Sequence, residues 1–330
     1  MPRRWAAVLV LAAGCGPAVE SDGPADLLVE DLGVLYLGWS KTGHVQEIAS
    51  PQPLHEGVWS PDGAMIAALD EAAGIRLVDP GSGESRILTT RSAMSLAWSP
   101  DSSRIAFVHR KEVEEGVGGS SLFVVERATG GVSEIPTRED PSSSTPKWSP
   151  DGEWLALCTA DFALLTRTGA PGPGLNEDCI NAEWSADSTS LLVQTHEGIH
   201  LWAPNMSAFE LIAEYTTGLA WTERAGRIAT TETVEDEGGR QRARTLVLED
   251  SGGVPMSVTD PPWWSSDLPM SWSPDGARLL VQRGWWSGER VRDTEDNLNQ
   301  LRVVSEQGED MVLRESTEWI WADWRPGDEH

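Results

Sequence analysis

Three residues in one short stretch have the types and spacing of a zinc-peptidase site. His196, Glu197 and His200 in "THEGIHLW" match the pattern HExxH. That pattern works on a helix, where both imidazoles lie on one face and bind zinc while the glutamate acts on the bound water. Here apolar runs on both sides favour two strands, and Gly198 suits a two-residue hairpin loop formed with Glu197. In that register the imidazoles point to opposite faces of the sheet, so we expect no metal site and no catalytic residue.

The first cysteine suggests a covalent modification. Cys15 ends the segment "LAAGC", which overlaps the end of a nine-residue apolar run (5–13) that follows Arg3 and Arg4. The run is too short to span a bilayer but suits an export signal. The segment resembles a bacterial lipobox, in which signal cleavage leaves a lipid-modified cysteine at the new N-terminus. We expect residues 1–14 to be a lipoprotein signal peptide and residues 15–26 to be the lipidated cysteine and a short tether; plain secretion is the alternative.

The other two cysteines, Cys158 and Cys179, are both in the region expected to fold. An oxidising compartment outside the cytoplasm permits a disulfide between them if the fold brings them close. Two free, buried thiols are the alternative. The sequence alone does not decide between these two states.

Two tryptophan pairs are candidates for partner binding. Trp263 and Trp264 lie in "DPPWWSSD", and Trp285 and Trp286 lie in "RGWWSG". Large exposed aromatic side chains are costly unless a partner covers them. These four residues therefore predict a platform for a peptide or a glycan. The alternative is that they anchor their own loops against the sheets.

A repeat defines the elements that must position these residues. "WSPDG" occurs three times and "WSPDS" once, and weaker copies begin at Trp184, Trp221 and Trp324. The seven tryptophans follow one another at intervals of 36 to 52 residues, which is the size of a propeller blade. Ser-Pro-Asp-Gly fits a tight turn, because proline presets φ at the second position and glycine closes the fourth. Short apolar runs follow each turn, as expected for strands covered on both faces.

The two ends of the chain predict how the ring closes. The last copy, in 318–327, offers one strand, and three more are available in 27–31, 34–38 and 45–49. Together these four strands complete a seventh blade. We expect residues 27–330 to form a single all-β domain, a β-propeller of seven four-stranded blades with six blades as the alternative.

The Trp-Ser-Pro-Asp-Gly turns resemble the TolB-type, WD-like propeller repeats. Similar repeats occur in the propellers of prolyl-oligopeptidase-type peptidases and in oligogalacturonate lyases. The resemblance covers residues 27–328 and implies the fold. It implies little about function. The peptidases carry a G-x-S-x-G elbow, which this sequence lacks, and the lyases use histidine-rich metal sites, whereas the six histidines here show no corresponding cluster.

The net charge of the chain excludes some classes of binding partner. The formal net charge is −27, from 52 acidic and 25 basic residues, so the surface repels nucleic-acid backbones and anionic lipids. We expect membrane association only through the N-terminal lipid, on the periplasmic face of an outer membrane or on the cell surface. No cofactor is expected.

Three long insertions indicate where a partner docks. They occupy 109–121, 231–243 and 283–300, each between the second and third strands of a unit. Insertions at one connection emerge on one face of a disc. The sequence thus predicts a non-enzymatic scaffold for a protein partner in the cell envelope. A glycan-binding propeller and a lyase or hydrolase that uses a divalent metal are the alternatives.

Overall fold

Each repeated Ser-Pro-Asp-Gly segment forms the same hydrogen-bonded turn between two antiparallel strands. In the first copy the Ser60 N–H donates to the Met65 carbonyl at 2.8 Å, and the Ser60 hydroxyl donates to Asp62 Oδ1 at 2.5 Å. The Met65 N–H donates back to the Ser60 hydroxyl at 2.9 Å. Gly63 has a φ of 63°, which glycine adopts without strain. The same arrangement recurs at Ser99, Ser149, Ser185 and Ser273.

The computed structural model describes residues 24–326 with internal gaps. The gaps are 71–73, 113–116, 138–139, 142–143, 159–162, 167, 173–174, 176–178, 186, 204–205, 207, 215–216, 222–226, 250–255, 286–297 and 306. All the regular elements described are β-strands, β1 to β27. In this part of the chain no helix has the length and hydropathy of a membrane span.

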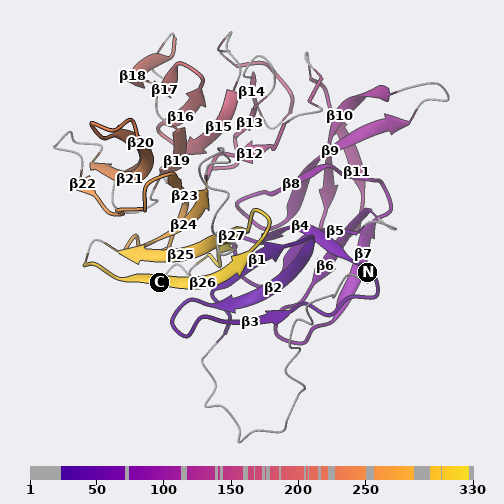
Figure 1. The fold of residues 1–330 in the computed structure, drawn as a ribbon. Helices are drawn as coiled ribbons and strands as arrows, with labels where there is room; N and C mark the ends of the chain where they lie inside the picture. Colours follow the sequence, from indigo (N-terminus) through magenta and orange to yellow (C-terminus); the bar gives the residue numbers. More distant parts are fainter. Residues whose placement is uncertain are drawn as a thin grey trace, which may run out of the picture.

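The strands follow one another in repeated antiparallel units (Figure 1). The first two units are β4 (Leu54–Trp59), β5 (Ile66–Asp70), β6 (Gly74–Val78) and β7 (Ser85–Thr89), then β8 (Ser95–Trp98), β9 (Arg104–Glu112), β10 (Val117–Glu126) and β11 (Val132–Ile135). The next two are β12 (Lys147–Trp148), β13 (Trp154–Leu157) and β14 (Ala163–Thr166), then β15 (Cys179–Trp184), β16 (Leu191–Thr195), β17 (Gly198–Trp202) and β18 (Glu210–Glu214).

The remaining strands form one large sheet and the closing blade. The large sheet contains β19 (Thr217–Trp221), β20 (Arg227–Glu235), β21 (Gln241–Glu249), β22 (Met256–Ser257), β23 (Ser265–Trp272), β24 (Arg278–Trp285), β25 (Asn299–Ser305) and β26 (Asp310–Ser316). The closing blade contains β27 (Trp321–Trp324), β1 (Leu27–Asp31), β2 (Val34–Trp39) and β3 (His44–Glu47).

The two ends of the chain close the ring by strand pairing. β27 lies antiparallel to β1, with Leu27 opposite Trp324 and Glu30 opposite Trp321. Figure 1 shows the yellow β27 beside the indigo β1. First strands of consecutive units contact each other from β4 through β8, β12, β15, β19 and β23 to β27, and β1 contacts β4. The predicted all-β propeller and its terminal closure are confirmed.

The blade count rests on one bridge. The large sheet consists of two antiparallel runs, β19–β22 and β23–β26, joined by a single parallel pair between Ala243 and Ser266. Counted separately, these runs and the other five sheets make seven units. Among the described residues, the unit β12–β14 has three strands, one fewer than predicted. After β14, Pro171 lies opposite Leu165 as an isolated bridge, and proline has no backbone N–H to donate to a strand ladder.

The repeated tryptophans join neighbouring blades. Trp98 is buried among residues of its own unit and of the preceding one, including Leu77 and Ile105. Its indole N–H donates to the carbonyl of Val58, the residue before Trp59, at 3.2 Å. The equivalent bond to the preceding unit is made by Trp184, Trp272 and Trp324. The core is therefore divided between successive blades, and each repeated tryptophan whose side chain is described fills one division.

Candidate binding cavity at the inner strands

A cavity of about 490 Å³ lies where several inner strands begin. We call it the mouth cavity. Its lining includes Ser95 at the start of β8, Ser144 before β12, and Trp319 and Trp321 at the start of β27. The turn between β1 and β2 also contributes. First strands begin, and second strands end, on the same side of the ring, so the mouth cavity opens on the face that carries the insertions.

A β-bulge in β4 presents one acidic side chain to the cavity. The pairing of β4 with β5 shifts between His55 and Val58, so Glu56 and Gly57 face a single residue of β5. Glu56 has a φ of 48°, which is uncommon for a non-glycine residue. A Cβ on Gly57 would lie 2.8 Å from Leu35 Cδ1. Glycine therefore permits the close approach of β4 to the closing blade, and the bulge turns Glu56 outward.

Two carboxylates meet at this bulge. The Glu56 N–H donates to Glu30 Oε2 at 2.8 Å, which fixes the Glu30 side chain beside Glu56. Desolvation, followed by repulsion from Glu30, raises the pKa of Glu56 to about 7. Desolvation also raises the pKa of Glu30. Glu56 as a residue keeps an exposed surface, so solvent screens part of this repulsion and its effect on folding is small.

Two tryptophans beside the carboxylates are exposed. Trp319 is 50% exposed and Trp321 is 37% exposed. The Trp319 ring lies over Gly284 of β24, where a Cβ would come within 3.1 Å of ring atom Cζ3. Sequence reasoning missed both residues because their neighbour Trp324 belongs to the repeat. The alternation of side chains along β27 was the available signal: successive residues of a strand point to opposite faces, so the buried Ala322 predicts that Trp321 points away from the core.

Three of the four tryptophans predicted from the sequence are described, and all three are half-buried. Trp263 is half-buried, with the Arg242 guanidinium 4.5 Å from its ring centre. Trp264 and Trp285 are also half-buried, and the Trp285 indole N–H donates to the Leu298 carbonyl at 3.1 Å. These contacts are those of loop anchors. Trp286 lies outside the described residues, and a partner-binding role for the four stays a prediction.

The HExxH segment is a hairpin. Leu191 pairs with Trp202 and Gln194 with Ile199, and β16 and β17 are joined by a turn at His196 and Glu197. The predicted loop at Glu197 and Gly198 is therefore wrong by one residue. The reason is that the Thr195 hydroxyl accepts the Glu197 N–H at 3.1 Å, which starts the turn earlier.

The two histidines of that hairpin have different environments. His196 is exposed in the turn, whereas His200 is buried with its Nε2 3.1 Å from the Thr195 hydroxyl. No cluster of three or more His, Cys, Asp or Glu side chains suited to a metal occurs among the residues described.

Two of the three cysteines form a disulfide. Cys158 follows β13 and Cys179 begins β15, and a disulfide joins them with a Cα–Cα distance of 4.8 Å. It connects the three-stranded unit to the next one. Cys15 and the whole of residues 1–14 lie outside the described residues, so signal cleavage and lipidation stay predictions.

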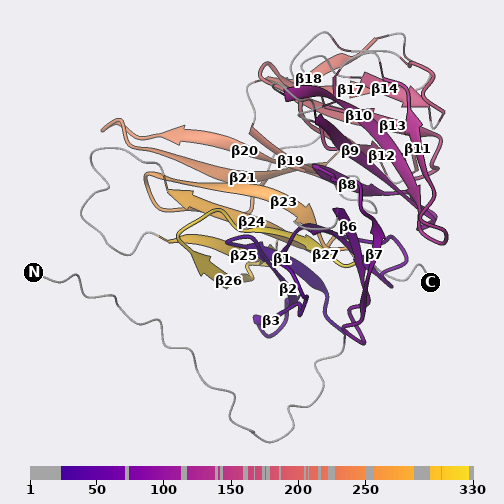
Figure 2. The same cartoon turned by 90° about the vertical axis from the view of Figure 1, so that its right-hand side faces the viewer.

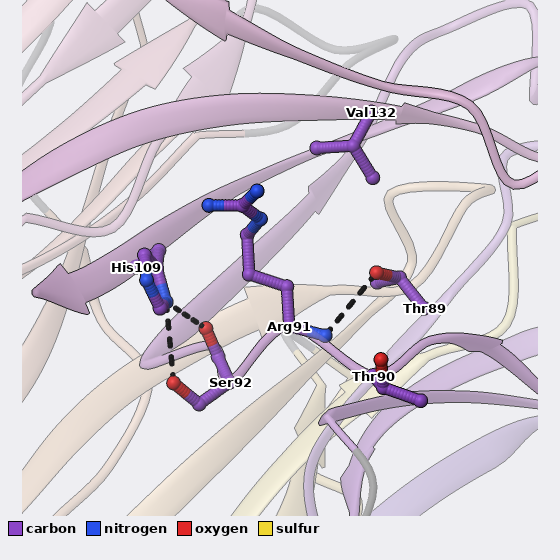
Figure 3. A pocket seen from close by; sticks show the side chains of 6 residues that line it. All are labelled: Thr89, Thr90, Arg91, Ser92, His109 and Val132. Atoms are coloured by element: carbon purple, nitrogen blue, oxygen red, sulfur yellow. Dashed lines mark hydrogen bonds between the residues drawn. The ribbon is translucent and has the colours of Figure 1, made fainter. Parts of the chain in front are cut away.

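A second hollow, of about 500 Å³, lies between the first two blades and is lined by five polar residues and Val132. Figure 3 shows the Arg91 side chain between His109 and Val132. The Arg91 guanidinium lies 4.4 Å from the Phe123 ring centre, and His109 Nδ1 lies 2.8 Å from the Ser92 carbonyl. These contacts join the blades within the chain, so the mouth cavity is the stronger candidate.

Comparison with known proteins supports the architecture. No family model matches the chain, and no curated protein matches it. Among solved structures, an oligogalacturonate lyase from Vibrio parahaemolyticus is similar with a TM-score of 0.62 and 13% identity, over 84% of each chain. A puromycin-hydrolyzing peptidase from Mycobacterium tuberculosis gives a TM-score of 0.61 and 12% identity, over 88% of this chain and 53% of the peptidase.

TolB from Acinetobacter baumannii is 14% identical over 92% of this chain and 67% of its own, with a TM-score of 0.49. That score is too low to carry an argument about this chain. At such identities the lyase and the peptidase show a common fold and nothing about activity. The chain is, on these grounds, a β-propeller whose fold is similar to those of the lyase and the peptidase.

Proposed function

We propose that this chain is a non-enzymatic, lipid-anchored propeller of the bacterial cell envelope that binds a protein partner over its mouth cavity. The exposure of Trp319 and Trp321 beside that cavity carries the proposal. Tryptophan is enriched among the residues that dominate binding energy at interfaces, and most other tryptophans described here are packed into the propeller. The envelope location rests on the lipobox-like sequence ending at Cys15.

The insertions support the choice of face. β9 with β10 and β20 with β21 form hairpins of nine to ten residues per strand, longer than the five-residue β5 and β6. These hairpins extend from the same face of the disc on which the mouth cavity opens. Figure 2 shows the β20–β21 hairpin projecting past its neighbours. Such hairpins add contact area around the cavity.

The test is crosslinking in cells followed by recovery of the propeller. Trp319→Ala/Trp321→Ala should lose the crosslinked partner. The matched control is Ile87→Ala/Ile212→Ala, which removes two equally exposed apolar side chains, each 45% exposed, from outer strands. The original candidates are tested by Trp285→Ala/Trp286→Ala. Unchanged recovery with the Trp319/Trp321 variant contradicts the proposed site.

A glycan-binding propeller is the second candidate, because sugars also stack on exposed tryptophan. It predicts that a neutral oligosaccharide quenches tryptophan fluorescence of the wild type and leaves that of Trp319→Ala/Trp321→Ala unchanged. Absence of quenching removes this candidate.

A further inference from the structure

We infer that the mouth cavity receives a cationic side chain, lysine or arginine, presented by the protein partner. The inference rests on the proposed function and specifies what that site recognises. Among the lining residues described, the only charged ones are Glu30 and Glu56. All the others are apolar, hydroxylated or glycine. His55, which is not a lining residue, interacts electrostatically with Glu30, and an ammonium or guanidinium group in the cavity would give the two carboxylates a full counter-charge.

The shape of the site suits a long side chain with a charged tip. The aliphatic stem of lysine or arginine packs on aromatic surface while its head remains polar. The exposed rings of Trp319 and Trp321 offer that surface, and cations are attracted to indole faces. Glu30, held by the Glu56 N–H, is already oriented to accept a charge-assisted hydrogen bond.

A further buried group at the cavity lacks a partner. Ser144 is 4% exposed and lines the cavity, and among the described residues its hydroxyl has no hydrogen-bond partner. The Ser144 carbonyl is already used by the Ser95 hydroxyl at 2.8 Å. Buried polar groups left unpaired in a native structure call for a ligand or water. The charge of the whole chain, −27, also favours association with a basic partner.

The local backbone agrees with a binding role. Glu56 holds a positive φ that glycine would adopt at lower cost, and strained residues of this kind cluster at functional sites. A structural role alone would favour glycine here. A glutamate at this position is explained when its carboxylate contacts a ligand.

The test uses the purified full chain and two fluorescent octapeptides, one with a central Lys-Leu-Lys and one with norleucine in place of both lysines. Fluorescence anisotropy should show binding of the lysine peptide to the wild type and at least tenfold weaker binding of the norleucine peptide. Glu30→Gln/Glu56→Gln should weaken the lysine peptide at least tenfold. Glu134→Gln, at an exposed site on β11, should not.

A second variant guards against a folding artefact. Glu56→Gly keeps the positive φ and is expected to fold, yet it should lose affinity for the lysine peptide as Glu30→Gln/Glu56→Gln does. If the lysine and norleucine peptides bind equally, or if the lysine peptide fails to bind the wild type, the cationic site is wrong.

The two proposals fail separately. If Trp319→Ala/Trp321→Ala loses the crosslinked partner while Glu30→Gln/Glu56→Gln retains it, the proposed function stands and the cationic inference is overturned. If the lysine peptide depends on both carboxylates but no partner is lost with the tryptophan variant, the cation site stands and the proposed function is overturned.

Discussion

Two serines in the repeated turns have a positive φ and also make a hydrogen bond to a neighbouring blade. Ser102 and Ser188 occupy the fourth turn position that glycine fills elsewhere, with φ of 56° and 59°. Each hydroxyl accepts a backbone N–H from the preceding unit's turn, that of Asp62 at 3.0 Å and that of Asp151 at 2.9 Å. The hydrogen bond between blades thus offsets the energetic cost of a positive φ at serine.

This pairing predicts the effect of two substitutions at Ser102. Ser102→Ala keeps the unfavourable φ and loses the bond, so it should destabilise the chain by about 1 kcal/mol. Ser102→Gly also loses the bond but relieves the backbone, so its cost should be smaller. Chemical denaturation of both variants measures the difference. Equal losses would show that the φ of 56° is not costly here.

The carboxylate pair predicts a pH-dependent change in stability. A Glu56 pKa that rises from its ordinary value to about 7 means that the folded state binds this proton more tightly than the unfolded state does. Stability from this group is therefore present at low pH and is lost as pH rises between the unfolded and folded pKa values. Glu56→Gln should stabilise the chain more at pH 8 than at pH 4. Thermal melts at both values test this, and an equal change at both would contradict it.

Secondary-structure elements were predictable where local chemistry determines them. The turn at Ser60 needs only its own five residues and Met65, so the repeat identified the blades and both partners of the closing pair. The mouth cavity depends instead on β1, β4, β8 and β27, which meet only after the ring closes. Trp319 is an example: its ring lies over Gly284, which is thirty-five residues earlier in the chain and leaves room for the ring because it has no Cβ. The predicted position of the HExxH turn was wrong by one residue, because the hydrogen bond from the Glu197 N–H to the Thr195 hydroxyl starts the turn before Glu197 and Gly198.

The hairpin between β16 and β17 predicts unequal effects at its two histidines. His200 is buried beside Thr195, so His200→Ala should destabilise the chain by about 1–3 kcal/mol. His196→Ala, in the exposed turn, should change stability by less than about 0.5 kcal/mol. Denaturation with and without added zinc measures both effects. A zinc-dependent rise in the wild-type midpoint that either substitution abolishes would revive the metal site.

At the scale of the whole molecule, closure depends on one short strand. Ile320, Ala322 and Trp324 are buried in a cluster with Leu27 and Val29 of β1. The Arg325 N–H also donates to the Asp26 carbonyl at 2.8 Å, at the position where the Ser60 N–H donates to the Met65 carbonyl in the first repeated turn. The closing blade therefore differs from the others chiefly in lacking a covalent connection between its first two strands.

That difference predicts the outcome of moving the chain ends. A chain truncated after residue 317 lacks β27 and should unfold at much lower denaturant, because loss of one buried tryptophan alone costs about 3–5 kcal/mol. A circular permutant should fold normally if a short Gly-Ser linker joins residue 326 to residue 24 and the new ends lie between Gly238 and Gly239, in the exposed turn of the β20–β21 hairpin. Its denaturation midpoint should be close to that of the natural order, since the linker makes the β27–β1 pairing local while the cut makes the β20–β21 pairing non-local. A truncated chain as stable as the full one, or a permutant that fails to fold, would show that β27 does not close the ring.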